Sequence, residues 1–281
     1  MILSDRTSLE QAVTDPKRRE AESAIRTPPD TVVLVEGMSD KIFFKTHCRS
    51  KGVTFQHTEW GIGKSHIVKQ VCSTDDYYGI VDMDHDFNSD ETSVSERLVD
   101  TRQQCCLYSF VSRRRSDDER IVDDAVKVIR SLVRIDQKER HELILELRSY
   151  SDRFQRFVEE RTKARLYKGR LGPGTEGAEE RSFTWRDITR PNNDPVSDLI
   201  SNSLRQGYKD FKRDFEDTLS AVGVRDHDLS EAIMILLQGK FGSNSPNRRE
   251  VNMQIGKLIE ESGNSQMVEH FLEQLGLSST P

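Results

Sequence analysis

The chain has 281 residues, of which 34% are hydrophobic and 32% are charged, and its formal net charge is −6. These values are typical of a globular protein with a well-solvated surface, long enough for one large domain or two ordinary ones of roughly 100–200 residues each. No stretch of the sequence approaches the about 18 consecutive apolar residues of a membrane span, so we do not expect a membrane protein. The net charge excludes a protein that binds nucleic acid through overall positive charge.

The N-terminal segment, residues 1–29, is polar and contains one helical pattern from Leu9 to Ile25. It lacks the basic-then-apolar pattern of a secretory signal, so we expect a cytoplasmic protein. The four cysteines form no C-x-x-C pair, and Cys105 and Cys106 are adjacent within an apolar run. This arrangement favours reduced, buried thiols over disulfides or a zinc site.

Residues 30–112 alternate between strand and helix patterns. Short apolar, β-branched or aromatic runs predict four strands, at 31–35, 53–57, 77–81 and 105–111. Helical patterns lie between them at 39–47, with Ser39 as the expected N-cap, and at 64–73. This alternation predicts an α/β domain whose parallel sheet carries helices on its faces.

Residues 113–281 have a different character. Apolar residues recur at helical spacing over 121–133, 143–157, 196–219, 229–238 and 250–275. We therefore predict an α/β fold with a C-terminal α-helical domain, which would supply substrate or partner contacts.

Two acidic clusters follow predicted strands. Glu36 comes directly after the first strand, and Asp82, Asp84 and Asp86 follow the third. The carboxyl ends of parallel strands meet at one edge of a sheet, where ligands of α/β proteins bind. Residues i and i+2 of an extended segment face the same way, so Asp82 and Asp84 should point together. Converging hard oxygen ligands favour Mg²⁺ or Mn²⁺ over zinc, and such ions activate water for phosphodiester cleavage.

The same residues carry a resemblance to a known family. Val-Glu-Gly-Met-Ser-Asp-Lys-Ile-Phe-Phe (35–44) and Val-Asp-Met-Asp-His-Asp (81–86) resemble the Toprim domain of topoisomerases, primases and overcoming-lysogenization-defect (OLD) nucleases. The likeness covers roughly residues 30–112. Its form is most similar to the single-Toprim effectors encoded beside ABC-type ATPases, as in the phage anti-restriction-induced system of bacterial defence.

The resemblance implies a Toprim catalytic domain with Glu36, Asp82 and Asp84 as metal-binding catalytic acids. Asp86 would be a further ligand or an outer-shell partner. Many relatives carry another acid after the fourth strand, and Glu119 lies at about that place, although the residues around it depart from the family pattern.

The implied function is a metal-dependent nuclease acting as an anti-phage effector. RNA, with tRNA first, is the expected substrate. An ABC-type ATPase assembly would restrain the protein, and release would allow it to dimerise. The alternatives are a DNA nuclease of the OLD type, nucleotidyl transfer as in primases, and a non-catalytic Toprim scaffold. The three acids favour a nuclease over a scaffold, and the chain shows no zinc module of the kind that primases carry.

Basic residues are the candidate substrate contacts. They are Lys41 and Lys64 near the acids, and Arg161, Lys163 and Arg165 in a basic helical pattern. The alternative is that these are ordinary solvated side chains.

Three other patterns are discounted. The segment 58–65 has Thr58 where a Walker A loop needs glycine, and 82–93 lacks the glycine and glutamate of a calcium loop. Asp228 is interpreted as a helix cap and His227 as an ordinary histidine.

Overall fold

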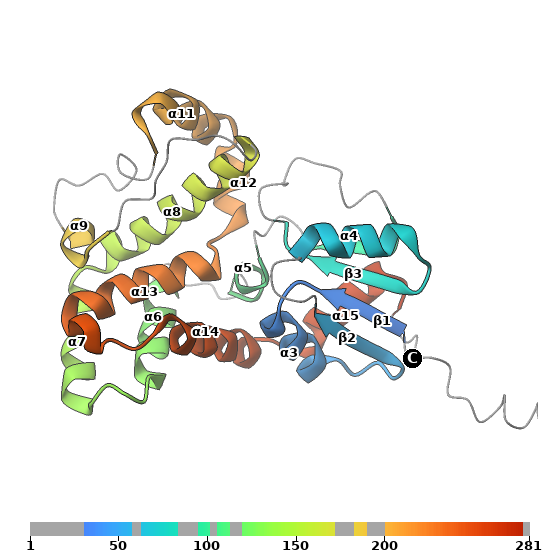
Figure 1. Cartoon of the computed structure of the whole chain (residues 1–281), viewed down its shortest axis with the longest axis horizontal. Helices are drawn as coiled ribbons and strands as arrows, with labels where there is room; N and C mark the ends of the chain where they lie inside the picture. The colour runs from blue at the N-terminus through green and yellow to red at the C-terminus, as the bar shows by residue number, and fades with distance from the viewer. Residues whose placement is uncertain are drawn as a thin grey trace, which may run out of the picture.

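In the computed structural model of the chain, the described residues are 31–57, 63–83, 95–101, 106–112, 120–171, 183–189 and 200–277. The first part of the fold is a parallel sheet flanked by helices (Figure 1). Its strands are β1 (Thr31–Val35), β2 (Val53–His57), β3 (Tyr77–Val81) and β4 (Leu98–Asp100), and its helices are α3 (Met38–His47), α4 (Gly63–Ser73) and α5 (Leu107–Ser112). The predicted α/β class is confirmed.

The four strands lie in the order β2-β1-β3-β4, and each pair is parallel. Within β1, Val33 lies opposite Phe55 of β2 and Tyr78 of β3. The central strands β1 and β3 are almost wholly apolar, as expected for strands buried on both faces.

The two faces of the sheet pack against different helices. Val33 and Val35 point into a core shared with Phe43 and Phe44 of α3. Leu34, between them in β1, points to the opposite face and joins a smaller cluster with residues of α4. Side chains alternate along a strand, so β1 alone contributes to both cores.

Gly79 in β3 permits the close approach of α4 to the sheet. A Cβ atom at this position would lie 2.7 Å from Ile67 Cγ2 and 2.8 Å from Leu98 Cδ1. Glycine usually weakens the interior of a strand, and the close packing of α4 explains why it is present here.

The described residues from Arg120 onward are mainly helical, as predicted. The helices are α6 (Arg120–Ser131), α7 (Gln137–Ser149), α8 (Ser151–Leu171), α9 (Trp185–Thr189), α11 (Arg205–Asp214), α12 (Glu216–Val222), α13 (Asp226–Phe241), α14 (Arg248–Ser262) and α15 (Ser265–Gln274), with 3₁₀ turns η2 (Asn202–Leu204) and η3 (Gly242–Asn244). None of the helices in the described ranges is long and apolar enough to cross a membrane.

The last two helices return to the sheet. Phe271 of α15 packs against Phe44 of α3, with ring centroids 5.4 Å apart, and against Phe110 of α5 at 4.9 Å. In Figure 1, α15 lies behind the strands. One hydrophobic cluster runs from the sheet through α3 and α5 into the helices after residue 120. The α/β part and the helical part therefore share a core.

Several local predictions are wrong. The predicted helical patterns over 143–157 and 196–219 are interrupted, at Tyr150 and at Phe215. The fourth strand is 98–100 rather than 105–111, and residues 107–111 of that apolar run belong to α5 instead. Short apolar runs do not distinguish a buried strand from a buried helix. The pattern over 250–275 is two helices, because Gly263 ends α14 and Asn264 caps α15. The N-cap of α3 is Gly37, not Ser39.

Candidate functional site

The sheet has a switch point at the carboxyl ends of β1 and β3. The chain leaves β1 through α3 to reach β2 on one side, and β3 lies on the other side of β1. Neighbouring strands whose connections run in opposite directions leave a crevice between their carboxyl ends, and ligands of open α/β sheets bind in such crevices. Glu36 follows β1 directly and Asp82 follows β3 directly. The sequence thus places one acid on each side of the crevice.

The Glu36 carboxylate reaches across the crevice. Its Oε1 atom accepts a hydrogen bond from the backbone N–H of Asp82, at 2.7 Å. This contact joins residues 46 apart in sequence, and Glu36 is half-buried there. The Glu36 carboxylate therefore lies at the start of the segment after β3, and the grouping of the Glu36, Asp82 and Asp84 carboxylates stays a prediction.

Asp82 connects the crevice to α5. Its Oδ1 atom accepts the backbone N–H of Leu107, the first residue of α5, at 3.1 Å. The turn after β3 is held by Thr101, whose hydroxyl accepts the N–H of Met83 at 3.1 Å and whose own N–H donates to Val81 O at 3.1 Å. Thr101 is only 2% exposed, so these bonds fix the backbone position from which the Asp82 side chain extends.

Two of the predicted substrate contacts lie at this edge. Lys64, in the first turn of α4, donates from Nζ to the carbonyl of Met83 at 3.4 Å. Lys41 lies in the first turn of α3, the helix that follows Glu36, and is half-buried. Both lysines are therefore carried by helices that begin at the carboxyl edge of the sheet.

Three predicted ligands, Asp84, Asp86 and Glu119, lie outside the described residues. Within the part of the chain that the structure describes, no group of three or more His, Cys, Asp or Glu side chains is placed to hold a metal ion. Glu36 and Asp82 still offer the hard oxygen donors that Mg²⁺ prefers. The donor set fits a magnesium ion if Asp84 completes it.

Asp40 is a further acid beside this edge. Its Oδ2 atom accepts the N–H of Gly37 at 2.9 Å, which closes the start of α3. Burial raises the pKa of Asp40 to about 6, against the lowering effect of the Gly37 hydrogen bond. Asp226 raises this pKa further and His227 lowers it. Because Asp226 and His227 begin α13, the start of that helix acts electrostatically on the start of α3.

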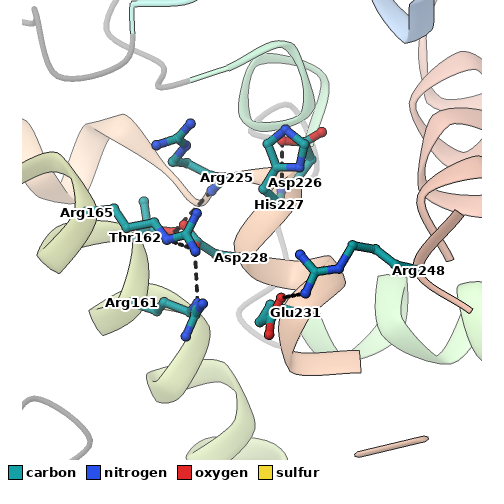
Figure 2. A network of polar contacts seen from close by, with 9 residues as sticks. All are labelled: Arg161, Thr162, Arg165, Arg225, Asp226, His227, Asp228, Glu231 and Arg248. Carbon is teal, nitrogen blue, oxygen red and sulfur yellow. Dashed lines mark hydrogen bonds and ion pairs between the residues drawn. The ribbon is translucent and has the colours of Figure 1, made fainter. Parts of the chain in front are cut away.

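A buried carboxylate lies two residues further along α13. Asp228 is 0% exposed, and Figure 2 shows it between two arginines of α8. Its Oδ1 atom lies 3.3 Å from Arg161 Nε and 3.1 Å from Arg165 Nε, and its Oδ2 atom accepts the Thr162 hydroxyl at 3.0 Å. Burial raises the pKa of Asp228, while the guanidinium groups of Arg165, Arg225 and Arg161 oppose that rise. This network fastens α13 to α8.

The network changes the interpretation of the basic helix. Arg161 is 3% exposed and faces Asp228, so it presents no surface to a phosphate in this conformation. Arg165 pairs with the same carboxylate and is 29% exposed at its side chain. Lys163 lies on another side of α8, where its Nζ atom is 3.6 Å from Glu160. Of the three predicted contacts, Lys163 is placed where it could bind a ligand, whereas Arg161 stabilises the fold through its ion pair with Asp228.

Sequence reasoning treated Asp228 as a helix cap and missed its role. The N-cap of α13 is Arg225, and Asp228 lies inside the first turn. A signal was available in the spacing of Arg161 and Arg165, since residues four apart share one face of a helix. Nothing in the sequence indicated which acid would lie opposite that face.

Comparison with known proteins finds no matching family model, no matching curated protein and no matching solved structure.

Proposed function

We propose that this chain is a metal-dependent nuclease of the Toprim type, with its reaction centre in the crevice between β1 and β3. The observation that carries the proposal is the hydrogen bond from the Asp82 backbone to the Glu36 carboxylate. It brings together one acid from each of the two motifs that resemble the Toprim pattern. The parallel order and the switch point also support it, because they leave these acids at the place where α/β folds bind ligands.

Glu36, Asp82 and Asp84 would hold the metal. When bound, Mg²⁺ would neutralise the converging carboxylates, lower the pKa of a water molecule and stabilise the leaving oxygen of the phosphodiester. The Asp82 N–H orients Glu36, and the bond from Leu107 to Asp82 fixes the second carboxylate. Lys64, anchored at the Met83 carbonyl, would contact a phosphate oxygen of the substrate.

The biological role proposed here rests on the resemblance of residues 35–44 and 81–86 to anti-phage effectors. RNA, and tRNA first, is the proposed substrate. An ABC-type ATPase assembly would restrain the enzyme, and the active form would be a homodimer. Co-expression with the product of an adjacent ATPase gene, followed by size-exclusion chromatography, tests the partner. Failure to co-elute, together with cells that tolerate the free chain, would contradict restraint.

The catalytic proposal is tested with purified protein in Mg²⁺, on tRNA and on plasmid DNA. Wild-type protein is expected to cut tRNA, and Glu36→Gln and Asp82→Asn are expected to be inactive. Both variants keep an acceptor oxygen for the backbone bonds, so circular dichroism should show an intact fold. The matched control is Glu142→Gln on α7, which should cut like wild type. Cutting of DNA alone would replace RNA by DNA as the substrate. Equal cleavage by wild type and Glu36→Gln would refute the proposed centre.

A further inference from the structure

A cleft in the helical part lies between α8, α11 and α12, helices that lie close together in Figure 1. It has a volume of about 350 Å³ and is lined by Lys163, Lys212, Arg213, Glu216 and Leu219. That volume falls within the roughly 300–1,000 Å³ of small-ligand sites. Three cationic side chains, one carboxylate and one apolar side chain therefore face the same space.

The two lysines are fixed by one acid. Glu160 lies 3.6 Å from Lys163 Nζ and 3.1 Å from Lys212 Nζ, and it accepts the Tyr208 hydroxyl at 3.1 Å. Lys212 Nζ also lies 4.9 Å from the centre of the Tyr208 ring. One carboxylate cannot neutralise two ammonium groups, so this trio keeps a net positive charge. Its geometry is set before a ligand arrives, which lowers the entropy cost of binding.

Arg213 adds an exposed guanidinium. Its side chain is 70% exposed and pairs with Asp210 and Asp214, each at 3.0 Å. A guanidinium has five N–H donors, so these pairs leave it able to donate to a phosphate as well. Nearby, residues 161–171 of α8 carry basic side chains and no acidic ones, although Arg161 and Arg165 among them pair with Asp228. The cleft therefore presents three cationic side chains, each of which also pairs with an acid of α8 or α11.

A short series of contacts connects this cleft with the crevice. Leu219, in its wall, belongs to α12, which ends at Val222. Two residues later the Val224 carbonyl accepts the Ser109 hydroxyl of α5, and the Cys106 thiol donates to it at 3.7 Å. The first residue of α5 in turn donates to Asp82. The α12–α13 junction therefore rests on the same short helix that holds the second acid of the reaction centre.

We propose that this cleft binds one ribonucleotide of an RNA strand whose cleavage takes place in the crevice, an inference that rests on the proposed nuclease function. Lys163, Lys212 and Arg213 bind the phosphate. Glu216 accepts a hydrogen bond from the 2′-hydroxyl group, the feature by which a protein distinguishes RNA from DNA. Leu219 packs against the sugar or the base.

Binding is measured with a short fluorescein-labelled single-stranded RNA and with DNA of the same sequence. The protein carries Glu36→Gln and the buffer contains no divalent metal, so that no strand is cut. Adding Lys212→Ala or Arg213→Ala is expected to weaken RNA binding about tenfold each, the loss of a charged hydrogen bond. Each should also flatten the dependence of log K on log salt by about 0.7. The matched control is Lys138→Ala on α7, an exposed lysine away from the cleft, which should leave both quantities unchanged.

Glu216→Ala tests the 2′-hydroxyl contact. Removing a negative charge strengthens binding of both nucleic acids, so the measured quantity is the ratio of RNA to DNA affinity, which should fall toward one. Competition with free AMP distinguishes a site for an RNA strand from a site for a mononucleotide. If the Lys212, Arg213 and control variants bind RNA with equal affinity, the proposal is overturned. It is also overturned if AMP displaces the labelled RNA as effectively as unlabelled RNA does. The binding measurements do not depend on cleavage. If the nuclease assay fails while the Lys212 and Arg213 variants still lose RNA affinity, the reaction centre is refuted and the cleft is not.

Discussion

Two carboxylate sites of this molecule differ in burial and in the contacts described for them. In the crevice at the sheet edge, the hydrogen bonds described for Glu36 and Asp82 come from backbone N–H groups, and both side chains are half-buried. In the helical part, Asp228 is fully buried, and its charge faces Arg161 and Arg165. A backbone amide orients a carboxylate but carries no net charge. The described bonds of the first site therefore orient its acids, whereas the second site surrounds its carboxylate with cations of the protein itself.

The largest effect is expected at the buried site. Asp228→Ala removes the counter-charge of Arg161, which is 3% exposed, and breaking a buried pair costs about 3–5 kcal/mol. Urea denaturation of the variant and the wild type measures the free energy of unfolding. The control is Asp210→Ala on α11, whose pair with the exposed Arg213 should contribute at most about 1 kcal/mol. A loss of less than about 1 kcal/mol for Asp228→Ala would show that the network is not structural.

The next effect depends on pH. The pKa of Asp40 is raised to about 6 in the folded protein, so the folded state binds this proton more tightly than the unfolded chain does. The stability that this carboxyl contributes is complete below its unfolded pKa of 3.8 and is lost as pH rises toward 6. One pKa unit corresponds to about 1.4 kcal/mol, so the loss is at most about 3 kcal/mol.

Asp40→Asn removes this titration and keeps an acceptor for the Gly37 N–H. Melting temperatures between pH 4 and pH 7 should therefore depend less on pH in the variant than in the wild type. The effect of His227 on Asp40 is tested with His227→Gln, which should raise the pKa of Asp40 and shift the transition to higher pH. Identical pH profiles for Asp40→Asn and wild type would contradict the assignment.

A smaller effect is expected when Glu36 is shortened. Glu36→Ala leaves the Asp82 N–H without its acceptor in a partly buried place, at a cost of about 1–3 kcal/mol. Glu36→Gln keeps an acceptor oxygen and should cost less than Glu36→Ala. Thermal denaturation of the two variants measures the difference. Equal stability would indicate that the bond contributes little to the fold.

The smallest effect is that of the metal. At a Mg²⁺ concentration ten times the dissociation constant, binding should stabilise the protein by about 1.4 kcal/mol. The rise in melting temperature should be absent in Asp82→Asn and retained in Arg165→Ala, whose altered side chain belongs to the arginine-balanced site. If both variants respond to Mg²⁺ like wild type, the crevice is not the site at which the metal binds.

The sequence by itself determined the first three strands and the meeting of Glu36 with the segment after β3. A strand buried on both faces needs a continuous apolar run, and the residue after such a run must lie at the sheet edge. It also determined that the described residues from Arg120 onward are mainly helical, through the spacing of their apolar side chains. It did not determine the structure of 105–111, because an apolar run of that length suits a buried strand or a buried helix equally.

Only the tertiary structure decided which charges neutralise one another. Arg161, Lys163 and Arg165 look alike along α8, yet the first and third face Asp228 and the second faces the cleft. Asp228 in turn is 66 residues from Thr162, its hydrogen-bond partner. Helical periodicity assigns a residue to a face of its own helix, but the packing of α8 against α13 determines what that face meets. The role of a charged side chain follows from that partner and its burial, and both are properties of the folded chain.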